Sequence, residues 1–150
     1  MEKKLTKKSA EILKMVRARL KESAATVLLG FEVESFGDGE AVLFLDVKPH
    51  HRQIHGVVHG GILAALVDTA AALAAYSVLP QGAEIATVQL SINYLAPVPD
   101  GRVRAAGKVL RVGRNFVVTE CEVLNTDGAV AAKALLTFGA AAGHSIQKKQ

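Results

Sequence analysis

The segment from about Gly60 to Val78 constrains the fold more than any other part of this sequence. It is rich in alanine and leucine, which are strong helix formers, and Pro80 and Gly82 end it. The predicted helix is apolar on nearly every side, and a helix of that kind is buried rather than laid on a surface. The rest of the chain therefore has to enclose it.

Six other segments have the composition and alternation of strands. Two precede the helix and four follow it, over residues 28–35, 40–47, 85–95, 102–112, 115–124 and 129–138. One buried helix with a meander of long strands predicts an α+β fold, in which an antiparallel sheet wraps around the helix. The 150 residues suit one domain over 25–139. An amphipathic helix over 9–23 is expected within an N-terminal extension, residues 1–24, and a disordered tail over 140–150.

The segment 85–95 has the most regular alternation of the six. Successive side chains of a strand point to opposite faces of the sheet, so this segment predicts two sets of residues. One set is Ala86, Val88, Leu90, Ile92 and Tyr94. The other set is Thr87, Gln89, Ser91 and Asn93.

Composition and charge exclude several classes of protein. The net charge is +4, and much of the excess lies in lysines near the two ends. With 5% aromatic residues and no basic helix face, no nucleic-acid partner is expected. No uninterrupted apolar stretch reaches the 18 residues of a membrane-spanning helix, and the basic N-terminus lacks the apolar core of a signal peptide. The single cysteine, Cys121, cannot form an internal disulfide. We therefore expect a cytoplasmic protein with no membrane partner.

Asp68 is the one charged residue of the apolar helix. A buried carboxylate is costly unless it is paired or hydrogen-bonded, so Asp68 is either a structural or subunit contact or a functional group. Its helical neighbours are all alanines, which allow a ligand or another backbone to approach closely: Ala64, Ala65, Ala71 and Ala72. The residue alone leaves both interpretations open.

The helix opens with His59, Gly60 and Gly61. The first N–H groups of a helix have no partner within it, and they lie at the positive end of the helix dipole. Glycines let a ligand reach this backbone, so the helix start is a candidate oxyanion hole for an acyl carbonyl. The alternative is that the two glycines only permit a tight turn into the helix.

Gly60 and Asp68 lie too far apart to act on one substrate within one chain. Eight helical residues span roughly 12 Å. An oxyanion donor and a base each have to lie about 3 Å from the reacting groups. In a two-fold dimer with antiparallel helices, Gly60 of one subunit can face Asp68 of the other. If this pair is catalytic, the protein is an obligate dimer with two composite sites.

Four histidines between residues 50 and 59 raise the question of a metal, but no metal site is expected. His55 and His59 have the spacing of a zinc-binding helix, yet Gly56 and the helix start near His59 place His55 in a loop. The sequence also lacks the HExxH motif, the G-x-S-x-G motif of a serine nucleophile and a phosphate-binding P-loop.

The spacing of Gln53, His59-Gly60-Gly61 and Asp68 resembles the hotdog-fold acyl-CoA thioesterases. The segment from Thr87 to Pro97 is similar to the strand that follows the helix in that family. The resemblance covers roughly residues 25–139 and is strongest to a subgroup with phenylacetate-pathway, small human-type and hydroxybenzoyl-type thioesterases. It implies a curved antiparallel sheet around the helix. It also implies a homodimer with one continuous sheet, and the pairing of two such dimers into a homotetramer.

The resemblance implies a role for each site residue. The Gly60 N–H polarises the thioester carbonyl, and Gln53 helps to hold the carbonyl or the water. Asp68 of the partner subunit acts as general base or nucleophile, and the sequence does not decide between the two. Thr87 orients the water. This contact depends more on Thr87 here, because Ala72 stands where aromatic-acyl relatives can carry Ser or Thr. His59 orients the loop or assists at the carbonyl.

Contacts to the substrate and its CoA portion are expected from Gly61, Val88, Arg111, Gly113 and Arg114. The basic residues belong to the hairpin after the third long strand, which lies near the CoA phosphates in this family, and phosphates bind charged donors well. Lys108, on the same strand, is expected to be an ordinary solvated charge.

We therefore expect an acyl-CoA thioesterase that hydrolyses a medium-chain or aromatic acyl-CoA to the free acid and CoA. No cofactor is expected, because coenzyme A is part of the substrate. Two alternatives remain. One is a hotdog dehydratase, whose histidine and carboxylate motifs are not found here. The other is a non-catalytic acyl-CoA sensor, a class that usually lacks the full catalytic set.

Overall fold

The computed structural model describes residues 7–140 of the chain. Two helices come first, α1 (Lys7–Leu20) and α2 (Ala24–Leu29), followed by β1 (Phe31–Gly37) and β2 (Glu40–Asp46). A 3₁₀ turn, η1 (Pro49–His51), leads through a loop to the long helix α3 (Gly60–Tyr76). The remaining strands are β3 (Ile85–Tyr94), β4 (Arg102–Val112), β5 (Phe116–Leu124) and β6 (Val130–Ala140).

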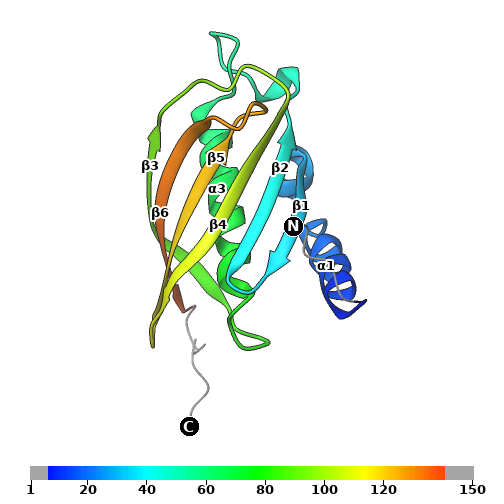
Figure 1. The fold of residues 1–150 in the computed structure, drawn as a ribbon, viewed down its shortest axis with the longest axis vertical. Coiled ribbons are helices and arrows are strands. Elements are labelled where there is room, and N and C mark those ends of the chain that lie inside the picture. Colours follow the sequence, from blue (N-terminus) through cyan, green and yellow to red (C-terminus); the bar gives the residue numbers. More distant parts are fainter. Residues whose placement is uncertain (1–6, 141–150) are drawn as a thin grey trace.

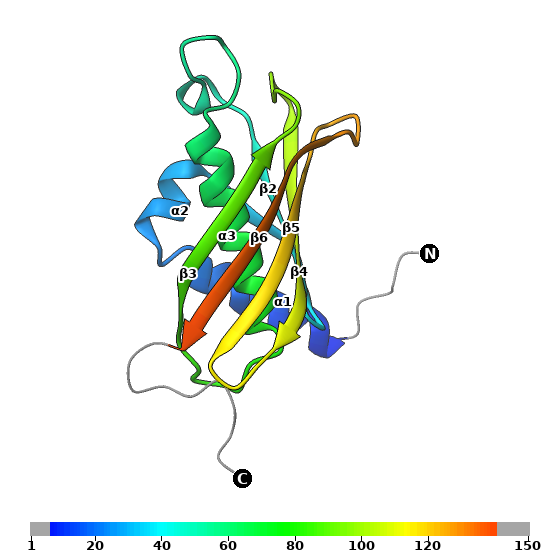
Figure 2. The same ribbon diagram turned by 90° about the vertical axis from the view of Figure 1, so that its left-hand side faces the viewer.

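The six strands form one antiparallel sheet in the order β1-β2-β4-β5-β6-β3. The sheet curves around α3, which runs along its concave side (Figure 1; Figure 2). This arrangement confirms the α+β hotdog fold expected from the sequence. Strand β3 lies at one edge of the sheet and β1 at the other, with α1 packed beside β1.

The alanines of α3 allow the sheet to approach the helix closely. Ala70, Ala71, Ala74 and Ala75 are fully buried. Opposite them is Gly107 of β4, where an added Cβ would lie 2.7 Å from the Ala70 carbonyl oxygen and 2.9 Å from the Ala71 nitrogen. Backbone therefore packs against backbone at this point, and no larger residue fits without a shift of the strand or the helix.

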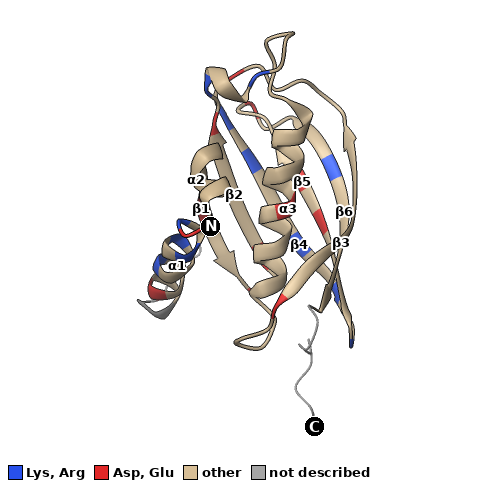
Figure 3. Ribbon diagram, turned by 180° about the vertical axis from the view of Figure 1, so that it is seen from behind, with Lys and Arg blue, Asp and Glu red and all other residues tan. Residues whose placement is uncertain are grey.

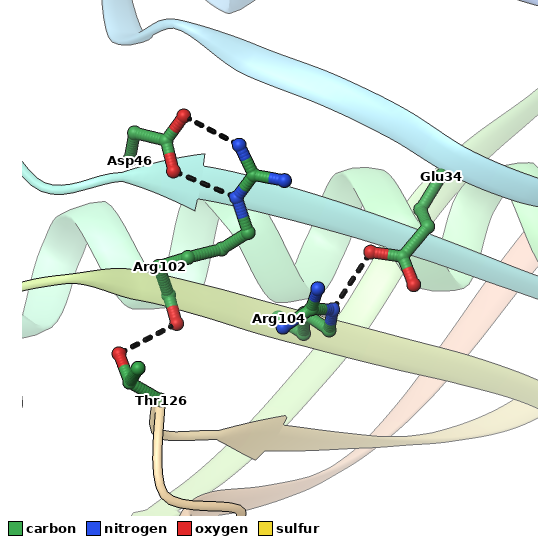
Figure 4. A network of polar contacts seen from close by, with 5 residues as sticks. All are labelled: Glu34, Asp46, Arg102, Arg104 and Thr126. Carbon is green, nitrogen blue, oxygen red and sulfur yellow. Dashed lines mark hydrogen bonds and ion pairs between the residues drawn. The ribbon is translucent and has the colours of Figure 1, made fainter.

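The charged residues lie mainly on α1 and along the strands of the sheet, while α3 is almost uncharged (Figure 3). Figure 4 shows one network on the outer face, which links the first three strands of the sheet order. The Arg102 guanidinium donates to both carboxylate oxygens of Asp46, at 2.7 and 2.8 Å, and Arg104 donates to Glu34 at 2.7 Å. These pairs hold β1, β2 and β4 together from outside.

The first predicted strand was placed too early. Residues 28 and 29 belong to α2, and β1 begins at Phe31. Ser23 caps the start of α2, and Gly30 ends it with φ of 73°, a left-handed conformation that favours glycine. The remaining strands and α3 follow the predicted segments to within about two residues at each end. The predicted domain boundary at residues 24 and 25 stays a prediction. Ala140 ends β6, and the rest of the predicted tail, 141–150, lies outside the described residues.

A β-bulge changes the faces of β3 from those predicted. The pairing of β3 with β6 shifts register between Thr87 and Gln89, which leaves Val88 as the extra residue. Ile85, Leu90 and Ile92 pack against the core, and Thr87 contacts α3. The prediction of one unbroken alternation was therefore wrong, because Thr87 shares the helix-facing side with Leu90 and Ile92.

Within residues 7–140, no helix has the length and hydropathy that crossing a membrane requires.

Candidate active site

The start of α3 is fixed by His59, the N-cap residue. Its backbone is extended, and its Nδ1 accepts a hydrogen bond from the Gly61 N–H at 2.9 Å. The His59 N–H in turn donates to the carbonyl of His51 at 2.8 Å. Nδ1 is thus the unprotonated ring nitrogen. The His59 side chain thus holds the first turn of the helix, and both roles expected for it in catalysis stay predictions.

The Gly60 N–H is free at this helix start. Over the part of the chain that the structure describes, no group accepts a hydrogen bond from it. Gly60 also lines a pocket of about 300 Å³. The other lining residues are mostly apolar: Val57, Val58, Leu63, Tyr94, Leu95, Ala96, Pro97 and Val98. A free N–H at the positive end of a helix, beside an apolar pocket, can stabilise a developing negative charge on an acyl oxygen.

Tyr94 is a pocket residue to which the sequence analysis assigned no role. Its hydroxyl donates to the Gly60 carbonyl at 2.7 Å, and half of its side chain is exposed. The signal in the sequence was a tyrosine on the apolar side of a strand, since a phenol there needs a partner for its hydroxyl.

Asp68 lies near the middle of α3 and reaches the edge strand β3. The Thr87 hydroxyl donates to Asp68 Oδ1 at 2.8 Å. Thr87 reaches the helix because the bulge at Val88 puts it on the inner face of the sheet. Asp68 is half-buried and Thr87 is exposed, so the pair opens toward the uncovered edge of β3. One carboxylate oxygen is held by Thr87, and within residues 7–140 no donor is bound to the other.

Gln53 lies in the loop that precedes α3. The loop is closed by the Gln53 N–H, which donates to the Val57 carbonyl at 2.8 Å, and by a bridge between Arg52 and Val58. The side-chain oxygen of Gln53 accepts from the His55 N–H. Its amide NH₂ group is therefore the end that can donate to a ligand carbonyl.

Three comparisons with known proteins identify the family. Residues 55–132, just over half of the chain, match the thioesterase superfamily. A putative esterase of Halobacterium salinarum is 36% identical over 118 residues, which cover 73% of this chain and 76% of the relative. The chain belongs to the thioesterase superfamily.

Solved structures agree with the assignment. The PaaI protein of Escherichia coli, from the phenylacetic acid degradation operon, has a TM-score of 0.81 at 26% identity, over 93% of this chain and 99% of that one. A thioesterase of Haemophilus influenzae has a TM-score of 0.81 at 25% identity, over 92% of this chain and 94% of that one. The protein is therefore an enzyme of the thioester hydrolase class, as the sequence predicted.

The hairpin residues expected to contact CoA lie far from Gly60 within one protomer. The β4–β5 hairpin, with Arg111, Gly113 and Arg114, is at the lower end of the molecule with the end of α3, whereas the loop before Gly60 is at the upper end (Figure 1; Figure 2). In the described part of the chain, Arg111 and Arg114 form no ion pair. Lys108 lies 4.0 Å from Glu40, as expected of an ordinary surface charge.

Of the two apolar residues expected to contact substrate, Gly61 lies at the helix start and Val88 lies away from it. Gly61 belongs to the first turn of α3, next to Gly60. Val88 is exposed and packs over Gly139, on the outer face of the sheet near Phe116. The structure therefore does not bring Val88 to the Asp68–Thr87 pair within one protomer, and its contact with substrate stays a prediction.

One of the four histidines between residues 50 and 59 is buried, His51 at the end of η1. Its Nδ1 accepts from the Lys48 N–H at 2.9 Å, so Nε2 carries the proton and donates to the Leu29 carbonyl at 3.0 Å. Burial lowers the pKa of His51 from its ordinary value, because the charged form loses its hydration. Among residues 7–140, no three His, Cys, Asp or Glu side chains gather as a metal site requires.

Proposed function

We propose that this thioesterase hydrolyses a medium-chain or aromatic acyl-CoA, in a site that two subunits build together. The observation that carries the proposal is the hydrogen bond from Thr87 to Asp68, which aims a carboxylate at the open edge of the sheet. A carboxylate oriented by a neighbouring hydroxyl, half-buried on an otherwise apolar helix, suits general base catalysis.

In the proposed reaction, the thioester carbonyl accepts a hydrogen bond from the Gly60 N–H of one subunit. The Gln53 amide of that subunit donates to the same carbonyl. Asp68 of the other subunit removes a proton from a water molecule, whose oxygen attacks the carbonyl carbon. The Gly60 N–H stabilises the resulting oxyanion. The carbon–sulfur bond then breaks, and the CoA thiolate takes up the proton, leaving the free acid.

Strand β3 supports the two-subunit site. It is an edge strand of ten residues, and its free edge can pair with a second copy. Thr87 contacts Asp68 near one end of β3, and Tyr94 contacts Gly60 at the other end. A two-fold axis between these ends, near Leu90, would bring Asp68 of one subunit toward Gly60 of its partner. Such a dimer would let Gly60 and Asp68 act on one substrate, although they lie roughly 12 Å apart along one helix.

The same axis would bring the β4–β5 hairpin of one subunit toward the helix start of the other. Arg111 and Arg114, which have no ion pair in the described chain, would then be near the CoA phosphates. A further pairing into a homotetramer belongs to this proposal. It would cover exposed apolar side chains of the outer face, such as Phe116 and Leu135.

The pocket beside Gly60 supports the choice of acyl group. Its volume of about 300 Å³ and its apolar lining suit a medium chain or an aromatic ring. The similarity to E. coli PaaI, a protein of phenylacetic acid degradation, points in the same direction.

The first experiment measures thiol release from short, medium, long and aryl acyl-CoAs. Asp68→Asn keeps the shape of the side chain and the bond from Thr87 but removes the charge. We expect it to lower kcat by about a hundredfold or more. Asp100→Asn, which changes an exposed carboxylate in a turn, is the control and should leave kcat unchanged. If the wild type binds CoA esters without hydrolysing any of them, the protein is a sensor. Label from H₂¹⁸O found in Asp68 would instead indicate a nucleophile.

The second experiment tests the shared site directly. Asp68→Asn and Gln53→Ala chains are prepared separately, then mixed and allowed to exchange subunits. A site shared between subunits should regain about a quarter of the wild-type rate, since half of the dimers are mixed and each of these keeps one intact site. A site within one chain would regain nothing, because every chain in the mixture carries a lesion. Light scattering reports the number of subunits.

A further inference from the structure

The peptide unit between Gly60 and Gly61 is held at both ends by side chains. Its carbonyl accepts a hydrogen bond from the Tyr94 hydroxyl at 2.7 Å, and its N–H donates to His59 Nδ1 at 2.9 Å. The Tyr94 ring also covers the Gly60 backbone, since a Cβ added to Gly60 would lie 3.2 Å from Tyr94 Cζ. Two side chains from separate elements thus fix one peptide of the helix start.

Helix formation alone does not require the bond from Tyr94. The first helical hydrogen bonds go to the carbonyl of the N-cap His59, from the Ile62 and Leu63 N–H groups, and the carbonyl of Gly60 is the next acceptor along the helix. The Tyr94 hydroxyl is a second donor to that oxygen, which has two lone pairs. Half of the Tyr94 side chain is exposed, so water could satisfy the hydroxyl instead. The tyrosine is nevertheless directed at the carbonyl of Gly60, the residue whose N–H is free.

We propose that Tyr94 is a positioning residue for the oxyanion hole, acting through the Gly60–Gly61 peptide. Its hydroxyl and ring fix the conformation of Gly60, and the conformation of Gly60 sets the direction of its free N–H beside the pocket. This inference rests on the proposed function of Gly60. A hydrogen-bond donor works in catalysis only when it is aimed at the position of the oxyanion, and small errors of placement are costly.

The proposal predicts a specific kinetic signature. An oxyanion donor acts more strongly in the transition state than on the bound substrate, so misplacing it lowers kcat and leaves KM nearly unchanged. Tyr94→Phe keeps the ring and the pocket wall but removes the hydroxyl. We expect kcat to fall about tenfold, less than the hundredfold or more that removing an oxyanion donor costs, because the N–H is still present. KM should stay within about twofold.

The chain provides a matched control in its only other tyrosine, Tyr76. The Tyr76 hydroxyl also contacts backbone, accepting from the Ile85 N–H at 3.4 Å, and the side chain is 39% exposed. It lies at the far end of α3 from Gly60. Tyr76→Phe therefore removes a hydroxyl of the same kind without touching the helix start, and it should leave both kcat and KM unchanged.

A second readout does not depend on catalysis. The Gly61 N–H donates to His59 Nδ1, which should slow its exchange with solvent, and its peptide is held by Tyr94. Loss of one hydrogen bond should accelerate hydrogen exchange at Gly61 about two- to tenfold in Tyr94→Phe. Exchange in Tyr76→Phe should match that of the wild type. Amide exchange followed by NMR measures both, and the spectra show directly that each variant is folded.

The outcomes separate this inference from the proposed function. The inference is supported if Tyr94→Phe lowers kcat, leaves KM unchanged and accelerates exchange at Gly61, while Tyr76→Phe does none of these. Unchanged kcat, or a change in KM alone, overturns it and leaves Tyr94 as an ordinary pocket residue. If the wild type hydrolyses no acyl-CoA, the proposed function fails. The exchange rate of Gly61 then decides whether Tyr94 holds this peptide, and an unchanged rate overturns that claim too.

Discussion

Replacing Gly107 with alanine tests the close packing of β4 against α3. The added Cβ would lie 2.7 Å from the Ala70 oxygen, 2.8 Å from the Ala70 carbonyl carbon and 2.9 Å from the Ala71 nitrogen. The φ of Gly107 is not in the left-handed region, so alanine can adopt this backbone conformation, and the cost is one of space alone. All three contacts are with helix backbone, which cannot turn aside as a flexible side chain can.

The expected loss follows from these contacts. Overpacking a well-packed core costs about 1–3 kcal/mol. Replacing glycine with alanine also lowers the conformational entropy of the unfolded chain, which stabilises the folded state by about 0.4–1 kcal/mol. We therefore expect Gly107→Ala to lower the free energy of unfolding by about 1–2 kcal/mol. For a chain of this size each kcal/mol lowers Tm by about 2–4 °C, so Tm should fall by about 2–8 °C.

Urea unfolding followed by far-UV circular dichroism measures this loss. Protein concentration has to be held fixed, because dimerisation would make the apparent stability depend on it. Ala106→Ser is the matched control, since the neighbouring side chain is only half-buried and points out of the opposite face of β4. Its effect should stay within about 0.5 kcal/mol. A Gly107→Ala protein as stable as the wild type, with the same slope in urea, would refute the claim that backbone contact leaves no room here.

Three further predictions concern single side chains. Thr87→Val removes the hydrogen bond to Asp68 but keeps the shape, so kcat in the thiol-release assay should fall about tenfold, while Thr137→Val on the next strand should have no effect. Because burial lowers the folded-state pKa of His51, the unfolded chain binds more protons below about pH 6.5, and stability should decrease as the pH falls through that value. Urea midpoints between pH 5 and 8 measure this slope, which should be smaller in His51→Gln. Burial raises the pKa of Cys121 to about 12, so iodoacetamide should label it only after denaturation, and labelling of the native protein would contradict its burial.

The long apolar helix made most of the fold predictable from sequence. A segment that is apolar on nearly every side has to be enclosed, and the segments around it had the period of strands, so an antiparallel sheet wrapped around a helix followed. The start of β1 was missed because Leu28 and Leu29 are apolar and suit a strand as well as a helix. Their helical state depends on local capping by Ser23 and Gly30, which the apolar pattern does not report.

The bulge in β3 limited the prediction of the site. The residues around it alternate without interruption in the sequence, and no glycine or proline marks the extra residue Val88. The bulge is visible only in the pairing with β6. The bulge allows the hydrogen bond between Thr87 and Asp68, because without it Thr87 would be on the opposite face from Leu90 and could not reach the helix. The resemblance to a known family supplied Thr87 as a site residue, which strand alternation alone had placed elsewhere.

The alanines of α3 differ in what they contact, and the sequence did not tell which of them pack against the sheet and which stay exposed. A run of alanines allows either a ligand or another backbone to approach, and the structure divides the run between them. Ala71 is fully buried against β4, so its small size serves the packing of the sheet onto the helix. Ala64 and Ala65 remain partly exposed along the same helix as Asp68. Composition is therefore a poor guide to pocket size in this protein, because only the alanines away from the sheet leave space that a substrate or a partner subunit can fill.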